Sequence, residues 1–245
     1  MKRQIFPNPQ AVAEVAAQQA VAALQAAIET YGNATWVVAG GSTPMAAYAV
    51  LVDQYLDALD WSKVTVVIGD ERCVPLDDPE SNWRQIATVL LDQLPLSVES
   101  VRPLAEQGAL AAESYERHLR SLPLNDAGLP RLDHVWLGMG PDGHTLSIFP
   151  GHPSLAEAAG DKLVIFVDDS PKPPPQRISL SFLALTAAHS CLVLVSGEAK
   201  APVMARIAEG DESLPVARAV ATVETAGGEV LWLLDQAAAG STATA

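Results

Sequence analysis

Short runs of apolar residues alternate along the chain with longer segments in which apolar residues recur every three or four positions. The short runs predict β-strands at residues 35–40, 64–68, 134–137, 162–167, 177–181, 191–195 and 230–234. The longer segments predict helices at residues 12–28, 45–59, 82–91, 109–122 and 198–208. Strands that alternate with helices and are apolar throughout are typical of a parallel sheet buried on both faces. The predicted fold class is α/β with three layers: a largely parallel, doubly wound, Rossmann-like sheet between helices.

The alternation of strands and helices continues along the chain almost to its end, which indicates a single domain. The 245 residues contain no internal repeat and no long linker, and the composition shifts only at the end. We therefore predict one α/β domain over residues 1–235 and a flexible C-terminal tail at residues 236–245. The first ten residues lack the apolar core of a signal peptide, and the longest apolar runs fall short of the ~20 residues that span a bilayer.

Charge limits the kinds of partner that the chain can bind. The sequence has 15 basic and 29 acidic residues, a formal net charge of -14. A field of that sign repels nucleic-acid backbones and anionic membranes, so we expect a small-molecule ligand, and an anionic one requires a few well-placed cations. Cys73 and Cys191 make no disulfide framework, which favours a reducing, cytoplasmic compartment. The sequence leaves the oligomeric state open, and a monomer is the simpler expectation.

Glycine, hydroxyl and basic residues gather where predicted strands end, and ligands of parallel sheets bind beyond those carboxyl ends. Gly40, Gly41, Ser42 and Thr43 offer close backbone approach, two hydroxyl groups and N–H groups at a helix start, which together suit a phosphate. Lys200 lies at another predicted helix start and is one of five lysines in the chain. A capped turn and a solvated surface lysine are the alternative interpretations.

Candidate acid, base and cation side chains follow or precede other strands: Asp70, Arg72, Asp142, His144 and Arg177. Asp70 and Arg72 belong either to a structural ion network or to an acid/base group with an anion clamp, and Arg177 has the same two interpretations. His144 ends a glycine-rich segment two residues after Asp142, a context that suits a general base. The chain has no HExxH or paired CxxC motif, so we expect neither a metal nor an organic cofactor.

In order and spacing these motifs resemble the 6-phosphogluconolactonase family, within a superfamily that includes glucosamine-6-phosphate deaminase. The resemblance covers nearly the whole chain and is most specific in GMGPDGHTLSIFP, with support from GGSTP, GDERCVP, SNW, RISLS and SGEAK. It implies hydrolysis of 6-phospho-D-glucono-1,5-lactone to 6-phosphogluconate, the second step of the oxidative pentose phosphate pathway. It also implies that the 40–43 loop and Lys200 hold the phosphate and that Arg72 and Arg177 lie along the substrate.

The resemblance further implies that His144 is the base that activates water. Asp142 is close enough in sequence to orient its ring, and Asp70 is the competing candidate for the base. Lactone hydrolysis needs an activated water, a stabilised oxyanion and a hold on the remote phosphate, but no covalent intermediate. Arg72 and the backbone N–H groups of residues 138–143 both remain candidates for stabilising the oxyanion.

Two other functions are compatible with the same motifs. The first is an aminosugar-phosphate isomerase or deaminase, in which Asp70 abstracts a proton; Arg72 and the HTLSIFP segment favour the lactonase instead. The second is a non-catalytic sugar-phosphate sensor. A sensor normally carries a further partner-binding domain and needs no base, whereas Asp142 and His144 are both present.

Overall fold

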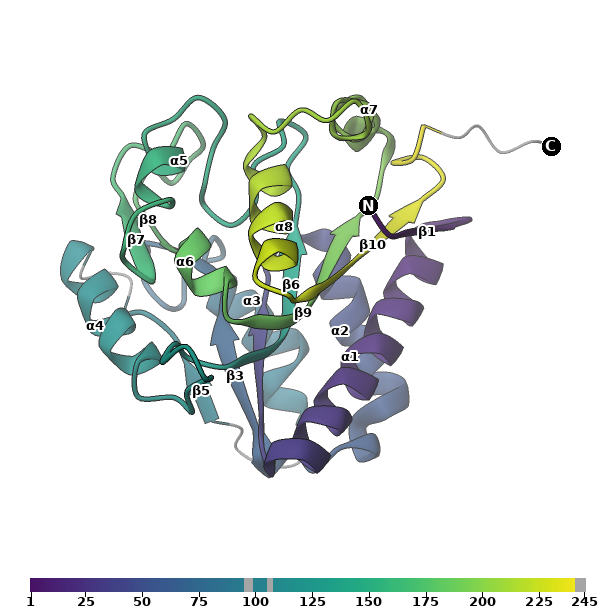
Figure 1. Ribbon diagram of the computed structural model, residues 1–245. Coiled ribbons are helices and arrows are strands. Elements are labelled where there is room, and N and C mark those ends of the chain that lie inside the picture. Colours follow the sequence, from purple (N-terminus) through teal and green to yellow (C-terminus); the bar gives the residue numbers. More distant parts are fainter. Residues whose placement is uncertain (95–98, 105–107, 241–245) are drawn as a thin grey trace.

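The central layer is a seven-stranded sheet in the order β1-β10-β9-β6-β2-β3-β5, and all its neighbouring strands are parallel (Figure 1). The computed structural model describes residues 1–94, 99–104 and 108–240. The strands are β1 (Arg3–Phe6), β2 (Ala34–Val38), β3 (Val64–Ile68), β5 (Glu99–Val101), β6 (Leu132–Gly138), β9 (Ala188–Val195) and β10 (Glu229–Asp235). This architecture confirms the predicted α/β class.

Helices cover both faces of the sheet (Figure 1). One face packs against α1 (Pro9–Tyr31), α2 (Ser42–Tyr55) and α3 (Asn82–Val89). The other packs against α4 (Ala109–Leu119), α6 (Phe182–Leu185), α7 (Ala201–Ala208) and α8 (Pro215–Thr225), with the single turn α5 (Ser154–Glu157) at its margin. Short 3-10 turns complete the chain: η1 (Leu56–Ala58), η2 (Trp61–Lys63), η3 (Leu91–Gln93) and η5 (Glu198–Lys200).

Neighbouring side chains of the central strands enter opposite cores. In β6, Trp136 packs with the α1 and α2 side, whereas Val135 and Leu137 pack with the α4 and α8 side. Side chains alternate along a strand, so a strand between two helical layers must be apolar at every position. The uninterrupted apolar runs in the sequence therefore reflect burial on both faces.

A second, smaller sheet differs from the predicted arrangement. It joins β4 (Asp70–Arg72), β8 (Arg177–Leu180) and β7 (Val164–Val167), with both neighbouring pairs antiparallel. The segments at 164–167 and 177–180 were expected as strands of the largely parallel pattern. A proline-rich loop without a helix joins them, and such a connection permits an antiparallel return, whereas a parallel crossover usually contains a helix.

Several elements fall outside the predictions from sequence. β1 is an exposed edge strand in a segment for which no strand was predicted, and neither β4 nor α8 was predicted. α1 starts at Pro9, where Asn8 accepts a hydrogen bond from the N–H of Ala11, and ends at Gly32 in the left-handed region. By length and composition α1 could cross a membrane, but one face packs in the core against α2 and the sheet, as in the core helix of a globular domain.

The expected C-terminal tail is only partly described. Residues 236–240 form a turn, in which Ala238 is buried and donates its N–H to Asp235, and Gln236 donates its N–H to the carbonyl of Phe6. The structure thus holds the first half of the expected tail against the domain, and residues 241–245 lie outside the described residues.

The strand order places a ligand site at the centre of the sheet. From β2 the chain runs outward through β3 to β5, then returns to place β6 on the other side of β2. The loops that leave the carboxyl ends of β2 and β6 therefore diverge, and such a switch point opens a crevice in parallel sheets.

Candidate active site

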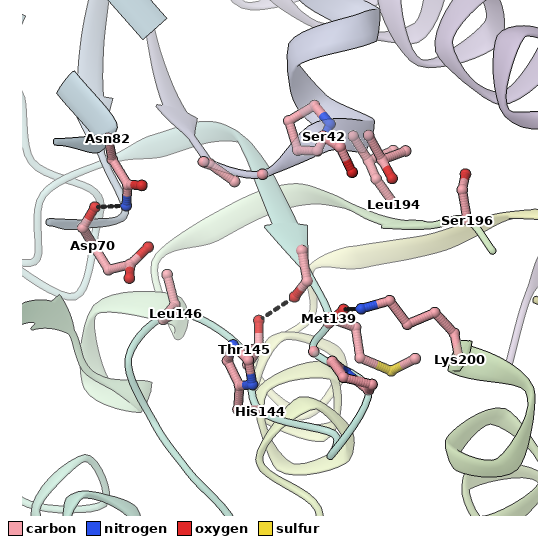
Figure 2. Close-up of a pocket in the computed structure, with 18 of the residues that line it drawn as sticks. Ser42, Asp70, Asn82, Met139, His144, Thr145, Leu146, Leu194, Ser196 and Lys200 are labelled. Atoms are coloured by element: carbon pink, nitrogen blue, oxygen red, sulfur yellow. Dashed lines mark hydrogen bonds between the residues drawn. The ribbon is translucent and has the colours of Figure 1, made fainter. Parts of the chain in front are cut away.

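A pocket of about 270 Å³ lies at this switch point, bounded by loops that follow β2, β3, β6 and β9 (Figure 2). The predicted site residues that line it are Gly40, Gly41, Ser42, Thr43, Asp70, Arg72, His144, Arg177 and Lys200. Asp142 does not line it but contacts His144. The structure thus brings together side chains that are more than 150 positions apart in the sequence.

The loop after β2 presents a helix start to the pocket. Helix α2 begins at Ser42, earlier than predicted, so Ser42 and Thr43 lie in its first turn, where backbone N–H groups have no intrahelical acceptor. Gly41 precedes them with φ 102°, a value that glycine adopts at little cost. A Cβ atom on Gly40 would lie 2.5 Å from Asn82 Oδ1, so the loop needs glycine there as well. This arrangement suits an anion.

Lys200 ends η5 and directly precedes α7, which confirms its predicted place near a helix start. Its Nζ donates to the carbonyl of Met139, at 2.6 Å. Burial lowers the pKa of Lys200, and the positive charge of Lys172 acts in the same direction. Figure 2 shows Lys200 and Ser42 on the same side of the pocket, with Ser196 nearby. Ser196 has a buried hydroxyl without a hydrogen-bond partner among the described residues.

His144 and Asp142 form a dyad at the pocket wall. Nδ1 of His144 lies 2.5 Å from Asp142 Oδ1, so this nitrogen carries the proton that Asp142 accepts, and Nε2 is left to accept another. The ring of Phe149 packs against the imidazole with centroids 4.9 Å apart. The hydrogen bond from His144 lowers the pKa of Asp142, as does one from Lys172, although burial opposes both. An imidazole that a carboxylate orients through Nδ1 is suited to general-base chemistry at Nε2.

The three residues of β4 have separate roles. Glu71 is 3% exposed and accepts hydrogen bonds from the backbone N–H groups of Arg72, Asn82 and Trp83 and from the hydroxyl of Ser81, which fixes the start of α3. Burial raises the pKa of Glu71 despite these bonds. On the other side of the strand, Asp70 and Arg72 line the pocket. Glu71 therefore has a structural role, and Asp70 and Arg72 are the residues of this segment that line the pocket.

Asp70 lies across the pocket from His144 (Figure 2). Its Oδ2 accepts a hydrogen bond of 2.6 Å from Ser147, and its carbonyl accepts one from Asn82 Nδ2 at 2.9 Å. Arg72 next to it forms an ion pair with Glu80, 2.7 Å between Nη1 and Oε2, while its Nε is buried without a partner among the described residues. The bonds to Glu80 both use Nη1 of the guanidinium, and the side chain as a whole lines the pocket.

Arg177, by contrast, makes its side-chain hydrogen bonds to backbone carbonyls of the protein. Its side chain donates to the carbonyl groups of Lys172, Pro173 and Pro174, at distances of 3.2, 2.9 and 3.0 Å. The residue is 5% exposed, and burial lowers its pKa, although Asp70 opposes that shift. Arg177 lines the pocket, and its side-chain hydrogen bonds organise the loop at 172–174.

Sequence reasoning gave no site role to several polar residues of this region: Asn82, Thr145, Ser147, Lys172 and Ser196. Asn82 entered through the SNW motif; it does not itself cap α3, because Ser81 caps that helix by accepting from the N–H of Arg84. Ser147 stands within the GHTLS segment, whose repeated hydroxyls were a usable signal. Lys172 lies in a proline-rich loop with no periodicity, so nothing local connects it with His144.

Fold and pocket together define an open α/β protein with a helix start and an imidazole–carboxylate pair at one switch point. The chain belongs to the family described as glucosamine-6-phosphate isomerases/6-phosphogluconolactonase, whose model matches residues 7–232. It is 37% identical to 6-phosphogluconolactonase of Mycobacterium tuberculosis, covering 96% of each chain, and 37% identical to that of Rattus norvegicus, covering 96% of this chain and 91% of the relative. The structure of 6-phosphogluconolactonase from Trypanosoma brucei is similar, with a TM-score of 0.82, 31% identity, and 98% and 97% of the two chains covered.

Proposed function

We propose that the protein hydrolyses 6-phospho-D-glucono-1,5-lactone to 6-phosphogluconate, the second step of the oxidative pentose phosphate pathway. The observation that carries this is a single pocket with the His144–Asp142 dyad in one wall and a helix start with Lys200 in another. A base and an anion site at separate places suit a substrate that has a reactive carbonyl at one end and a phosphate at the other. The lactonases that are similar to this chain support the assignment.

In the proposed reaction the phosphate binds at the N–H groups of residues 42–43 and at Lys200. A water molecule gives a proton to Nε2 of His144 and forms a bond to the lactone carbonyl carbon, which becomes a tetrahedral oxyanion. When this intermediate collapses, the bond from that carbon to the ring oxygen breaks, and the imidazolium returns its proton to the leaving oxygen. Asp142 holds the ring throughout and stabilises the imidazolium. Remote phosphate binding contributes by aligning the carbonyl with the water.

We assign the oxyanion to Arg72 rather than to the backbone of residues 138–143. The N–H of Gly140 already donates to the carbonyl of His144, and the N–H of Gly143 donates to that of Gly140. Arg72, by contrast, brings a positively charged side chain to the pocket wall, and its ion pair with Glu80 is made through Nη1. A positioned donor of this kind is worth about 10²–10³ in rate.

Hydrolysis of the phosphorylated lactone, the unphosphorylated lactone and glucosamine 6-phosphate, followed side by side, tests the proposal. We expect acid release from the phosphorylated lactone and no ammonia release from the amino sugar. Release of ammonia would identify the deaminase alternative. His144→Ala is expected to lower kcat by about 10²–10⁴ with little change in KM, since the phosphate contacts lie elsewhere. If kcat of His144→Ala stays within about threefold of wild type while Asp70→Asn is inactive, Asp70 is the base and His144 is not.

We also propose the setting in which the enzyme works. A charge of -14 and the nature of the substrate support a cytoplasmic enzyme that binds a small molecule and acts as a monomer, with no nucleic-acid or membrane partner. The reaction as written needs water and a base alone, so no metal or organic cofactor enters it.

A further inference from the structure

Lys172 contacts both members of the dyad from outside the pocket. Its Nζ lies 2.8 Å from Asp142 Oδ2 and 3.1 Å from His144 Nδ1. Since His144 Nδ1 donates its proton to Asp142 Oδ1, the ammonium group donates to the second oxygen, Oδ2, and stands beside the edge of the imidazole. One carboxylate thus receives a different donor on each oxygen, which fixes its rotation.

The loop that carries Lys172 is held at several points. The carbonyl of Lys172 accepts from Arg177 Nη2 and from the hydroxyl of Ser170, and its N–H donates to that same hydroxyl. Arg177 and Ser170 are both buried. A lysine at the surface usually samples many rotamers, whereas here both ends of the residue have fixed partners.

We propose that Lys172 is a positioning residue for the base: its ammonium group fixes the Asp142 carboxylate and sets how readily the His144 imidazole takes up and releases a proton. This inference rests on the proposed function, in which His144 must first accept a proton from water and then return it. A carboxylate alone stabilises the imidazolium and retards that return. A neighbouring cation offsets the carboxylate.

The charged groups around the imidazole come from four parts of the chain. Asp142 and Lys172 contact the ring, and Lys200 interacts electrostatically with both of them. Arg177 lies behind Phe149, 6.0 Å from the ring centroid, and Asp70 stands across the pocket. Of the cations, Lys172 is the one in contact with both dyad members, so its removal changes the local balance most.

The test compares Lys172→Met and Lys172→Gln with Lys172→Arg, which keeps the charge. Lys162→Met is the matched control, because Lys162 is an exposed lysine outside the pocket and its loss changes the net charge equally. We expect kcat of the two neutral variants to fall by up to about 10²-fold while KM stays within about twofold. The acid limb of the rate profile is expected to move to higher pH, because the imidazolium loses a repelling neighbour. Lys172→Arg is expected to recover part of both effects.

An NMR titration of the His144 ring proton, assigned by its absence in His144→Ala, gives a readout that needs no substrate. We expect the midpoint in Lys172→Met to lie above that of wild type and the midpoint in Lys162→Met to stay unchanged, because the first variant alone removes a cation that contacts the ring. If the wild-type protein does not hydrolyse the lactone but the midpoint still rises in Lys172→Met, the proposed function is refuted and the inference stands. An unchanged midpoint in Lys172→Met would overturn the inference. So would a loss of kcat on adding Lys172→Met to His144→Ala that is as large as the loss in the wild-type background.

Discussion

Substitution of Gly140 by alanine is expected to disable the dyad while it leaves the fold in place. Gly140 lies in the loop after β6, where its N–H donates to the carbonyl of His144 at 2.8 Å. Its φ is not in the left-handed region, so alanine is compatible with the backbone. A Cβ at this position would lie 2.0 Å from His144 Nδ1 and 2.5 Å from Asp142 Oδ1. The methyl group thus meets the two atoms that define the geometry of the base.

The magnitude follows from these distances. Non-bonded atoms approach to about 3.5 Å, so a ring atom at 2.0 Å must retreat by about 1.5 Å. Misplacement of a reacting group by about 1 Å can cost about 10²-fold in rate, and a general base contributes about 10²–10⁴ in all. We therefore expect kcat of Gly140→Ala to fall by about 10²–10⁴, close to the fall in His144→Ala, with KM nearly unchanged.

Steady-state kinetics with the phosphorylated lactone, corrected for spontaneous hydrolysis, measures this effect, and thermal unfolding checks the fold. Gly138→Ala is the control from the same segment, because a Cβ there would have the carbonyl oxygen of Gly40 as its nearest neighbour, at 3.8 Å. The double variant Gly140→Ala/His144→Ala is expected to match His144→Ala, since both changes remove the same base. A kcat for Gly140→Ala within about threefold of wild type would refute the reasoning.

Three further predictions concern other parts of the molecule. Lys200→Ala is expected to raise KM and also lower kcat for the phosphorylated lactone; an unchanged kcat/KM would remove Lys200 from the phosphate site. Activity is expected to survive exhaustive chelation, and a loss restored by one particular divalent ion would contradict this. Burial lowers the pKa of His134 to about 3 in the folded protein, whereas the unfolded chain binds that proton near pH 6.5. Stability is therefore lost as pH falls from 6.5 toward 3, by about 2 kcal/mol at pH 5, and chemical denaturation of His134→Gln should show a flatter dependence between pH 7 and 5.

The parts of the fold that were predictable from sequence are those whose burial leaves a local pattern. β3 was predicted at its observed bounds because a strand between two helical layers is apolar throughout. β1 was missed because an exposed edge strand has no such run. α8 starts with proline after a short polar segment and was overlooked for want of a strong N-terminal cap.

Some residues of the candidate site are likewise visible in a local sequence motif, whereas others come together only in the folded structure. His144 and Asp142 are two residues apart, so their motif is visible in one line of sequence, and the 40–43 loop is likewise continuous. Lys172 is 28 residues from His144 and reaches it only through the antiparallel return of β7 to β8, a tertiary arrangement that no periodicity encodes. Arg177 was located correctly in the pocket, but its bonds to the 172–174 carbonyls depend on how that loop folds.

The pleat of β4 has a consequence for how this pocket can change. Asp70 and Glu71 are adjacent carboxylates, yet one lines the pocket and the other holds the first turn of α3. The backbone separates the two tasks, so the residue at 70 can be exchanged to accept a different sugar without loosening α3, whereas an exchange at 71 strips several buried N–H groups of their acceptor. A change of substrate specificity is thus compatible with the fold at position 70 and incompatible with it at position 71.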